Sequence, residues 1–220
     1  MKRILSLCLV AVMLTLSLLS FTACAGQSAC VYFSERDTSG RDIAYAKIEF
    51  KNYGNVYLLL DRTTAPRTVD NFLKLASENF YDGLTMHRII ENFMIQGGDP
   101  KANGSGGSDD KLYGEFKQNG YSKNDLSHLY GVISMARGGD DMNSASSQFF
   151  ICNADSTHLD GNYAAFGYVI SGLQIVDKIT KDTVKYANAS SGTISDKSKQ
   201  AVIVTITEVT SEEALAAANA

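Results

Sequence analysis

Several side chains that could perform chemistry are spaced in ways that exclude the common catalytic and metal-binding motifs. The three histidines, His87, His128 and His158, share no ligand spacing and predict no metal site. The glycine-rich stretch over residues 97–107 lacks the Gly-Lys-Ser/Thr ending of a phosphate-binding loop, and no Gly-x-Ser-x-Gly turn presents a nucleophilic serine. We therefore expect neither nucleotide binding nor hydrolysis, and we interpret residues 97–107 as a tight structural loop.

A more specific signal is the run from residue 80 to residue 100, FYDGLTMHRIIENFMIQGGDP, in which Arg88 alone would pass for a surface cation. This run resembles the signature of the cyclophilins, the peptidyl-prolyl cis/trans isomerases. Further matches keep the family's order: NGSGG at 103–107, YGE at 113–115, GVISMA at 131–136, SQFFIC at 147–152, LDG at 159–161 and FG at 166–167. The resemblance covers nearly all of residues 43–209.

The resemblance implies a substrate groove on the outer face of a barrel and a role for each matching residue. Arg88 is the implied catalytic cation, and Gln96 is implied to hydrogen-bond the substrate backbone or to order its neighbours. The implied substrate-binding residues are Phe93, Met94, Phe150 and Leu159 in a proline pocket, Ala136, Arg137 and Gly138 along the peptide, Gly104 in an adjoining shallow pocket, and Gln148, His158 and Tyr163. The partners are then proline-containing polypeptides, and the reaction requires no cofactor and no metal.

An arginine suits the implied reaction. Rotation about an X-Pro bond is slow because amide resonance must be broken, at a barrier of about 18–20 kcal/mol. In the twisted transition state the prolyl nitrogen regains a lone pair, so a permanently protonated donor such as Arg88 can stabilise that state selectively.

Two positions depart from the family pattern. His158 stands where many members carry the tryptophan that helps to bind cyclosporin, so we expect weak binding of that drug. Tyr163 replaces a histidine of the pocket wall, and the loop over residues 139–147 is about two residues longer than in common members. These departures leave an alternative open, a non-catalytic chaperone or adaptor that binds peptides through a cyclophilin-like barrel.

The elements that must position these residues are mostly short strands. Residues 45–50 and 55–60 flank a turn signal and predict a hairpin, and further apolar runs lie at 86–95, 132–136, 148–152, 164–170 and 201–209. A helix is predicted to begin at Thr64-Ala65-Pro66, with Thr64 as a cap candidate, and to end near residues 82–83; a second is predicted over 173–179. So few helices favour a closed antiparallel sheet. The family resemblance specifies eight strands capped by two helices, a mainly β, α+β fold.

The N-terminal segment predicts export. Two basic residues precede an uncharged, Leu-rich run that ends near residue 23, which is typical of a signal peptide. The sequence Phe21-Thr22-Ala23-Cys24 resembles a bacterial lipobox, so we expect cleavage before Cys24 and a lipid anchor on its thiol. Ordinary secretion with cleavage near Ala25, or an uncleaved membrane anchor, are the alternatives. We interpret residues 24–42 as a tether, 43–209 as the isomerase domain and 210–220 as a flexible tail.

The charge and cysteine content bear on which partners and bonds the chain can form. The 220 residues carry 20 Lys and Arg against 24 Asp and Glu, a net charge of −4, which does not suit a nucleic-acid partner. Cys152 lies in an apolar run and is predicted to be a buried small hydrophobe. We expect a monomer on the outer side of the cell membrane.

Overall fold

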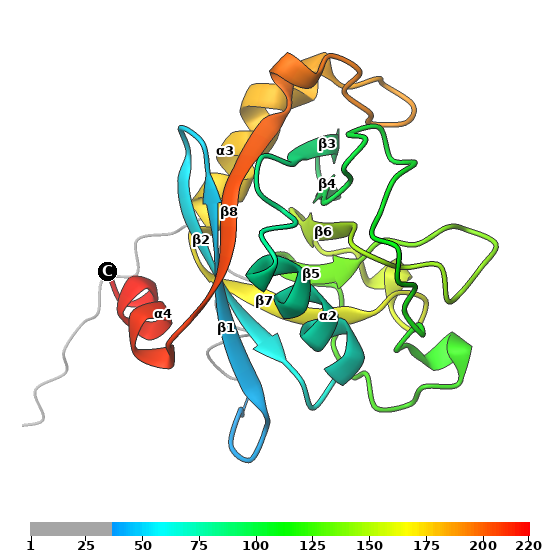
Figure 1. Ribbon diagram of the computed structural model, residues 1–220, viewed down its shortest axis with the longest axis vertical. Coiled ribbons are helices and arrows are strands. Elements are labelled where there is room, and N and C mark those ends of the chain that lie inside the picture. Colours follow the sequence, from blue (N-terminus) through cyan, green and yellow to red (C-terminus); the bar gives the residue numbers. More distant parts are fainter. Residues whose placement is uncertain (1–36) are drawn as a thin grey trace, which may run out of the picture.

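The computed structural model describes residues 37–220, so the predicted signal peptide and Cys24 lie outside the described residues. Its strands are β1 Ile43–Phe50, β2 Gly54–Asp61, β3 Thr85–Ile90, β4 Met94–Gly97, β5 Val132–Met135, β6 Phe149–Cys152, β7 Ala165–Ser171 and β8 Ala201–Val209. They pair antiparallel in the order β1-β2-β7-β5-β6-β4-β3-β8, and β8 returns to β1 to close the barrel (Figure 1). The predicted eight-stranded antiparallel barrel is confirmed.

The hairpin of β1 and β2 shows how local sequence fills the barrel. Ile43 lies opposite Asp61 and Phe50 opposite Gly54, as the predicted turn requires. Successive side chains of a strand point to opposite faces, so alternate residues of β1 point inward and are buried. These are Ala44, Ala46, Ile48 and Phe50, which join the main core.

Strands β5 and β6 do not alternate, because both of their faces are covered. All four residues of each strand are buried. On the outer side, Met94, Phe150, Cys152 and Leu159 form an apolar cluster of their own, separate from the barrel interior. Cys152 is fully buried, as predicted. The candidate site lies over this outer cluster.

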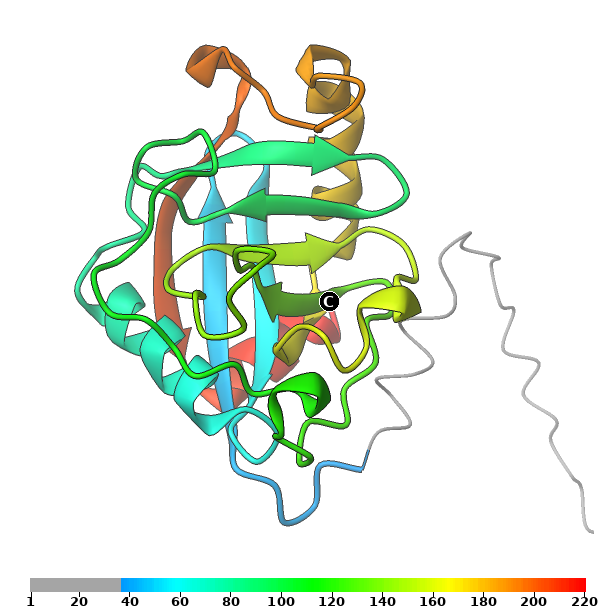
Figure 2. The same cartoon turned by 90° about the vertical axis from the view of Figure 1, so that its right-hand side faces the viewer.

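Helices α2 (Pro66–Ser77) and α3 (Leu173–Thr183) lie at opposite ends of the barrel (Figures 1 and 2). Each contributes its apolar face to the main core, with Phe72 on α2 and Ile179 on α3 both fully buried. Short 3₁₀ turns are η1 Lys117–Asn119, η2 Thr157–Leu159, η3 Val184–Tyr186 and η4 Lys197–Lys199. Among the described residues, no helix has the length and apolarity needed to cross a bilayer.

The N-terminus of α2 is capped from a distance rather than by Thr64, the predicted cap. Thr64 instead hydrogen-bonds Asp61. The carboxylate of Glu115 accepts from the amides of Arg67 (3.1 Å) and Thr68 (2.8 Å), which occupy the first turn. Unpaired N–H groups at a helix start favour such a negative charge.

Three predicted boundaries differ from the structure. The apolar run over residues 86–95 is two strands, because the chain reverses at Asn92 in a left-handed conformation (φ 58°). Helix α2 ends at Ser77, several residues before the predicted stop. The predicted flexible tail contains helix α4 (Ser211–Ala218), which packs against β1, β2 and β7 and buries Ala214.

Helix α4 is held by local and tertiary hydrogen bonds. The side chain of Thr210 accepts from the amide of Glu213 at 3.2 Å, an N-cap, and acidic residues occupy the first turn. The hydroxyl of Ser171 donates to the carbonyl of Ala217 at 2.8 Å, near the other end of the helix. The helix therefore belongs to the folded body.

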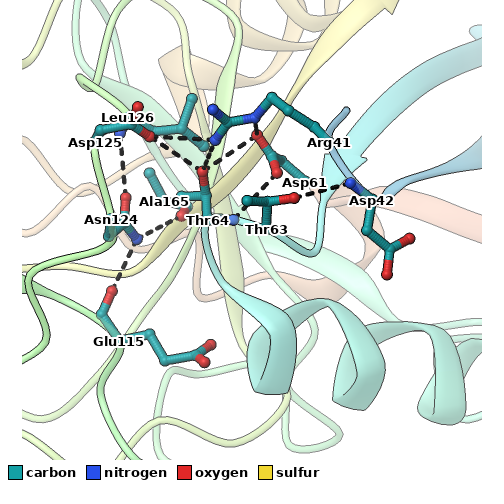
Figure 3. A network of polar contacts seen from close by, with 10 residues as sticks. All are labelled: Arg41, Asp42, Asp61, Thr63, Thr64, Glu115, Asn124, Asp125, Leu126 and Ala165. Carbon is teal, nitrogen blue, oxygen red and sulfur yellow. Dashed lines mark hydrogen bonds and ion pairs between the residues drawn. The ribbon is translucent and has the colours of Figure 1, made fainter. Parts of the chain in front are cut away.

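The described end of the predicted tether is attached to the barrel (Figure 3). Arg41 Nε donates to Asp61 Oδ2 at 2.7 Å, and its Nη2 contacts Thr64 Oγ1 at 2.5 Å and Asp125 Oδ1 at 3.4 Å. The amide of Asp42 donates to the hydroxyl of Thr63 at 2.8 Å. The interpretation of residues 24–42 as a tether is therefore wrong for Arg41 and Asp42. Residues 24–36 lie outside the described residues.

Candidate functional site

A cavity of about 160 Å³ opens on the outer face of β3, β4 and β6. It lies directly over the outer apolar cluster. Its walls bring together predicted residues from segments far apart in the sequence: Arg88, Phe93, Met94, Gln96, Ala136, Arg137, Phe150, Leu159 and Tyr163. We call it the proline cavity, after the predicted pocket that these residues match.

The floor of the proline cavity is apolar. Met94, Phe150 and Leu159 are almost fully buried and offer only part of their surface to the cavity, while Phe93 and Tyr163 are half-buried around them. The rings of Phe150 and Tyr163 meet edge to face, with centroids 6.0 Å apart. Aromatic packing of this kind holds the floor in one shape before a ligand arrives.

Arg88 places a cation beside this apolar floor. Its Nε donates to the carbonyl of Ser191 at 2.8 Å, and its Nη1 donates to Gln96 Oε1 at 3.0 Å and lies 3.8 Å from Met94 Sδ. Each of these partners is neutral. Burial lowers the pKa of Arg88, but an arginine starts so far above neutrality that it stays charged.

A chain of amide hydrogen bonds orients Arg88. Gln96 lies opposite Arg88 in the register of β3 and β4, and its Nε2 donates to Gln148 Oε1 at 2.9 Å. Gln148 in turn donates to the carbonyls of Gly104 (3.1 Å) and Gly106 (2.7 Å). The chain therefore connects Arg88 to the glycine-rich loop, and it fixes which side of the Gln96 amide faces Arg88.

A second cavity of about 230 Å³ adjoins the first. The two share Gln96, Ala136 and Arg137, and the second also takes in the predicted residues Gly104, Gly138 and Gln148. We call it the loop cavity. It matches the shallow pocket predicted beside the proline pocket.

His158 differs from the other predicted residues, because it does not line either of these cavities. It is exposed, and its ring lies against Phe93 with centroids 5.5 Å apart. It can therefore influence the site only by supporting Phe93 or by meeting a larger ligand at the rim.

Sequence reasoning missed Ser191, whose carbonyl holds Arg88. The loop before β8 approaches β3 closely, and Thr193 forms a bridge with Arg88. At Gly192, which has a φ of +75°, a Cβ would lie 2.4 Å from a side-chain carbon of Ile90. Gly192 was the feature of the sequence that could have indicated this close approach of the loop to β3. Lys111 and Ser144 in the loop cavity were also missed.

Ser134, His128 and Asp160 form a hydrogen-bonded Ser-His-Asp trio that packs against the floor of the proline cavity. His128 Nδ1 lies 2.8 Å from Asp160 Oδ1, and its Nε2 lies 3.0 Å from Ser134 Oγ. His128 and Ser134 have no exposed surface, so no substrate reaches them and the trio is structural. The His128 ring instead stacks on Phe150, with centroids 6.0 Å apart and planes 17° apart.

Within residues 37–220, no group of three or more His, Cys, Asp or Glu side chains is placed to hold a metal ion. The proline cavity offers two arginines, Arg88 and Arg137, together with a chain of amides and an apolar hollow. This combination can bind a small apolar ring and direct a hydrogen bond at one polar atom beside it.

Comparisons with known proteins agree with this geometry. The family model "Cyclophilin type peptidyl-prolyl cis-trans isomerase/CLD" matches residues 45–210. A peptidyl-prolyl cis-trans isomerase of Helicobacter pylori is 42% identical over 143 residues, which cover 64% of this chain and 83% of the relative. One of Synechococcus elongatus is 46% identical over 114 residues, 52% of this chain and 72% of the relative.

Solved structures give the same result for the fold. The crystal structure of a Cryptosporidium parvum cyclophilin-type peptidyl-prolyl cis-trans isomerase superposes with a TM-score of 0.65 at 28% identity. The match covers 77% of this chain and 99% of that one.

Proposed function

The chain belongs to the cyclophilin-type peptidyl-prolyl cis-trans isomerase family, and from that premise we propose that it accelerates X-Pro rotation in exported proteins and so assists their folding. The proposal for the site depends on the surroundings of Arg88. Its guanidinium borders an apolar cavity, and its hydrogen-bond partners within residues 37–220, Ser191 and Gln96 among them, are neutral.

The proposed mechanism uses a hydrogen bond that exists only in the transition state. In the planar ground state the lone pair of the prolyl nitrogen is delocalised into the carbonyl. As the bond twists, the nitrogen becomes pyramidal and can accept a proton donor. Arg88 supplies that donor, so it stabilises the twisted state more than either isomer. No covalent bond forms or breaks.

The apolar floor contributes by fixing one side of the rotating bond. Each ring CH₂ of proline gains about 0.8 kcal/mol when it leaves water. Phe93, Met94, Phe150 and Leu159 therefore grip the ring while the preceding residue turns. Excluding water also strengthens the hydrogen bond from Arg88, because competing donors are removed.

Gln96 acts in this scheme as a positioning residue. Its Oε1 accepts from Arg88, and its own amide is oriented by Gln148. The guanidinium is thereby aimed before the substrate binds, which avoids reorganisation at the moment of rotation.

The substrate class and location extend the proposal. A cyclophilin-type relative of known structure was crystallised in the presence of the dipeptide Ala-Pro, which supports proline-containing peptides as ligands here. Residues 1–23 favour export, and Cys24 favours a lipid anchor on the outer side of the cell membrane. We further propose a monomer that binds cyclosporin weakly, since His158 stands at the rim.

Isomerisation by purified protein spanning residues 24–220 tests the enzymatic part. NMR exchange spectra of an Ala-Pro peptide should show cis and trans signals exchanging faster than in buffer. Refolding of a protein limited by a slow proline step should accelerate in parallel. Binding of the peptide without faster exchange would favour the alternative, a non-catalytic adaptor.

Metabolic labelling with a fatty acid tests the anchor. Full-length protein should incorporate label and fractionate with membranes, and Cys24→Ala should lose the label. A Cys24→Ala protein that is cleaved and still membrane-bound would contradict the lipid anchor while leaving the isomerase proposal intact.

A further inference from the structure

The loop cavity has the position of a second subsite for a bound peptide. It shares Gln96, Ala136 and Arg137 with the proline cavity, so the two hollows meet along one wall. A peptide whose proline fills the first cavity can therefore place a nearby residue over the second. The character of the second cavity then influences which sequences are preferred.

The charge of the loop cavity is one-sided. Lys111 and Arg137 both line it, and no aspartate or glutamate of the described residues does. Lys111 is exposed and forms no ion pair within residues 37–220. Its amino group is free to meet an anion from solution.

Arg137 is preorganised in the same wall. Its Nε donates to the carbonyl of Asn162 at 3.0 Å, and its Nη1 donates to the carbonyls of Gly138 (2.9 Å) and Gly139 (3.1 Å). The guanidinium also lies over the rings of Tyr163 (4.8 Å) and Phe116 (5.3 Å). These contacts fix its position but neutralise none of its charge, and Nη2 has no partner among the described residues.

The aspartates near these two cations in the sequence do not line the cavity. Asp110 pairs with Lys74 at 3.3 Å, and Asp141 Oδ1 accepts from the amide of Asn143 at 2.8 Å. Asp109 and Asp140 are exposed, and neither lines the cavity. The two cations therefore lack an internal counter-charge within the hollow itself.

We propose that the loop cavity binds an acidic side chain of the substrate, so that the enzyme prefers prolines with an Asp or Glu close by. The inference rests on the proposed function, because it assumes that proline occupies the first cavity. A carboxylate in the hollow accepts charge-assisted hydrogen bonds from Lys111 Nζ and Arg137 Nη2. Such bonds are shorter and stronger than those between neutral groups.

Paired peptides test the proposal. Each pair carries one proline and differs only by Glu or Gln at one of the three positions on either side of it. At one position at least, kcat/KM should be about five- to tenfold higher for Glu, the size of one charge-assisted hydrogen bond at an accessible site. The ratio should shrink at high salt, which screens accessible charges.

Charge reversal identifies the residue responsible. Lys111→Glu should abolish the Glu preference, because the introduced carboxylate repels the substrate and competes for Arg137. The matched control is Lys123→Glu, which makes the same change at an exposed lysine outside the cavity and should keep the preference. A wild-type protein with no Glu preference at any position, or a preference that survives Lys111→Glu, overturns the proposal. Failure to isomerise any peptide would instead refute the proposed function.

Discussion

Two regions of the molecule are each organised around an arginine, and they use its charge in opposite ways. In the cluster of Figure 3, Arg41 contacts the carboxylates of Asp61 at 2.7 Å and Asp125 at 3.4 Å. At the proline cavity, Arg88 is held by the carbonyl of Ser191 and the amide oxygen of Gln96. Arg41 is neutralised by carboxylates, whereas Arg88 has no carboxylate partner in the part of the chain that the structure describes.

The difference agrees with a structural role for Arg41 and with the catalytic role proposed for Arg88. A carboxylate partner cancels the field of an arginine, so the pair serves to join segments of the chain. Carbonyl and amide oxygens orient a guanidinium by their dipoles but leave its full positive charge in place. That charge is then available to a polar atom of a ligand in the apolar cavity. The comparison predicts that removing Arg88 affects rate, whereas removing Arg41 affects stability.

The largest expected effect is that of Arg88→Ala on catalysis. Loss of a donor aimed at the transition state typically reduces the rate about 10²- to 10³-fold, and we expect a loss of that size in kcat/KM for a proline tetrapeptide. The midpoint of urea unfolding should change little, because no carboxylate of residues 37–220 pairs with Arg88 and would lose its cation. A variant as fast as the wild type would remove Arg88 from the mechanism.

Arg41→Met should have the converse effect. It removes the cation that lies 2.7 Å from the carboxylate of Asp61, which is 1% exposed. We expect the free energy of unfolding in urea to fall by about 2–3 kcal/mol, somewhat less than for a fully buried pair because Arg41 is itself 20% exposed. The activity per folded molecule should be unchanged.

Arg62→Met is the matched control for Arg41. Its main partner, Asp70, lies 2.9 Å away and is 64% exposed, so the pair is at the surface. Exposed pairs contribute about 1 kcal/mol or less. Equal losses for the two variants would contradict the structural role given to Arg41.

Patterns local to the chain predicted most of the barrel, and tertiary contacts account for what they missed. The hairpin of β1 and β2 follows from alternation and a turn signal in adjacent residues. The cap of α2 could not be predicted in this way, because Glu115 lies 47 residues from Thr68. The break at Asn92 was missed because Glu91 and Asn92 interrupt the apolar run only briefly, without a glycine or proline to mark a turn.

The site shows the same limit. The motif around Arg88 identified the apolar wall, since the matching residues are close in sequence or in recognisable order. Ser191 and Lys111 belong to no motif. The loop before β8 brings the carbonyl of Ser191 to Arg88 on β3, and Lys111 lies in a loop segment that lines the loop cavity. Ser191 matters because its carbonyl comes close to Arg88, and Lys111 matters because its charge lies in the loop cavity. A local sequence pattern predicts neither placement.

Acid should lower the free energy of unfolding through two buried histidines, His87 next to Arg88 and His128 under Phe150. Burial lowers the pKa of both His87 and His128 despite the nearby Asp99 and Asp160, and for His87 the charge of Arg88 adds to the lowering. The unfolded chain then binds more protons below about pH 6.5. Stability should be full above that pH and fall as pH drops, by up to about 1.4 kcal/mol per pH unit from each histidine.

Urea unfolding at pH 7.5, 6.5 and 5.5 measures this dependence, above the range where most carboxylates titrate. The Arg41 cluster contains no histidine, so Arg41→Met should lower the whole curve without changing its slope. A flat profile over this range would mean that neither histidine is held neutral in the folded protein.

The smallest expected effect, on the amide chain, tests how the charge of Arg88 is aimed. Gln148→Leu removes the acceptor that orients Gln96, so the Gln96 amide can turn its Oε1 away from Arg88. We expect kcat/KM to fall about fivefold, the value of one net hydrogen bond, with the loss in kcat rather than in KM. Gln148→Glu keeps an acceptor for Gln96 Nε2 and should restore part of the activity.

A double-mutant cycle distinguishes positioning from direct contact with the substrate. If Gln148 acts only through Gln96 and Arg88, then Gln148→Leu should cost nothing further once Arg88 is alanine, because there is no guanidinium left to aim. A full fivefold loss in the Arg88→Ala background would show that Gln148 contacts the peptide itself. The chain of amides would then be part of the binding surface, and the neutral partners of Arg88 would matter only because they leave its charge intact.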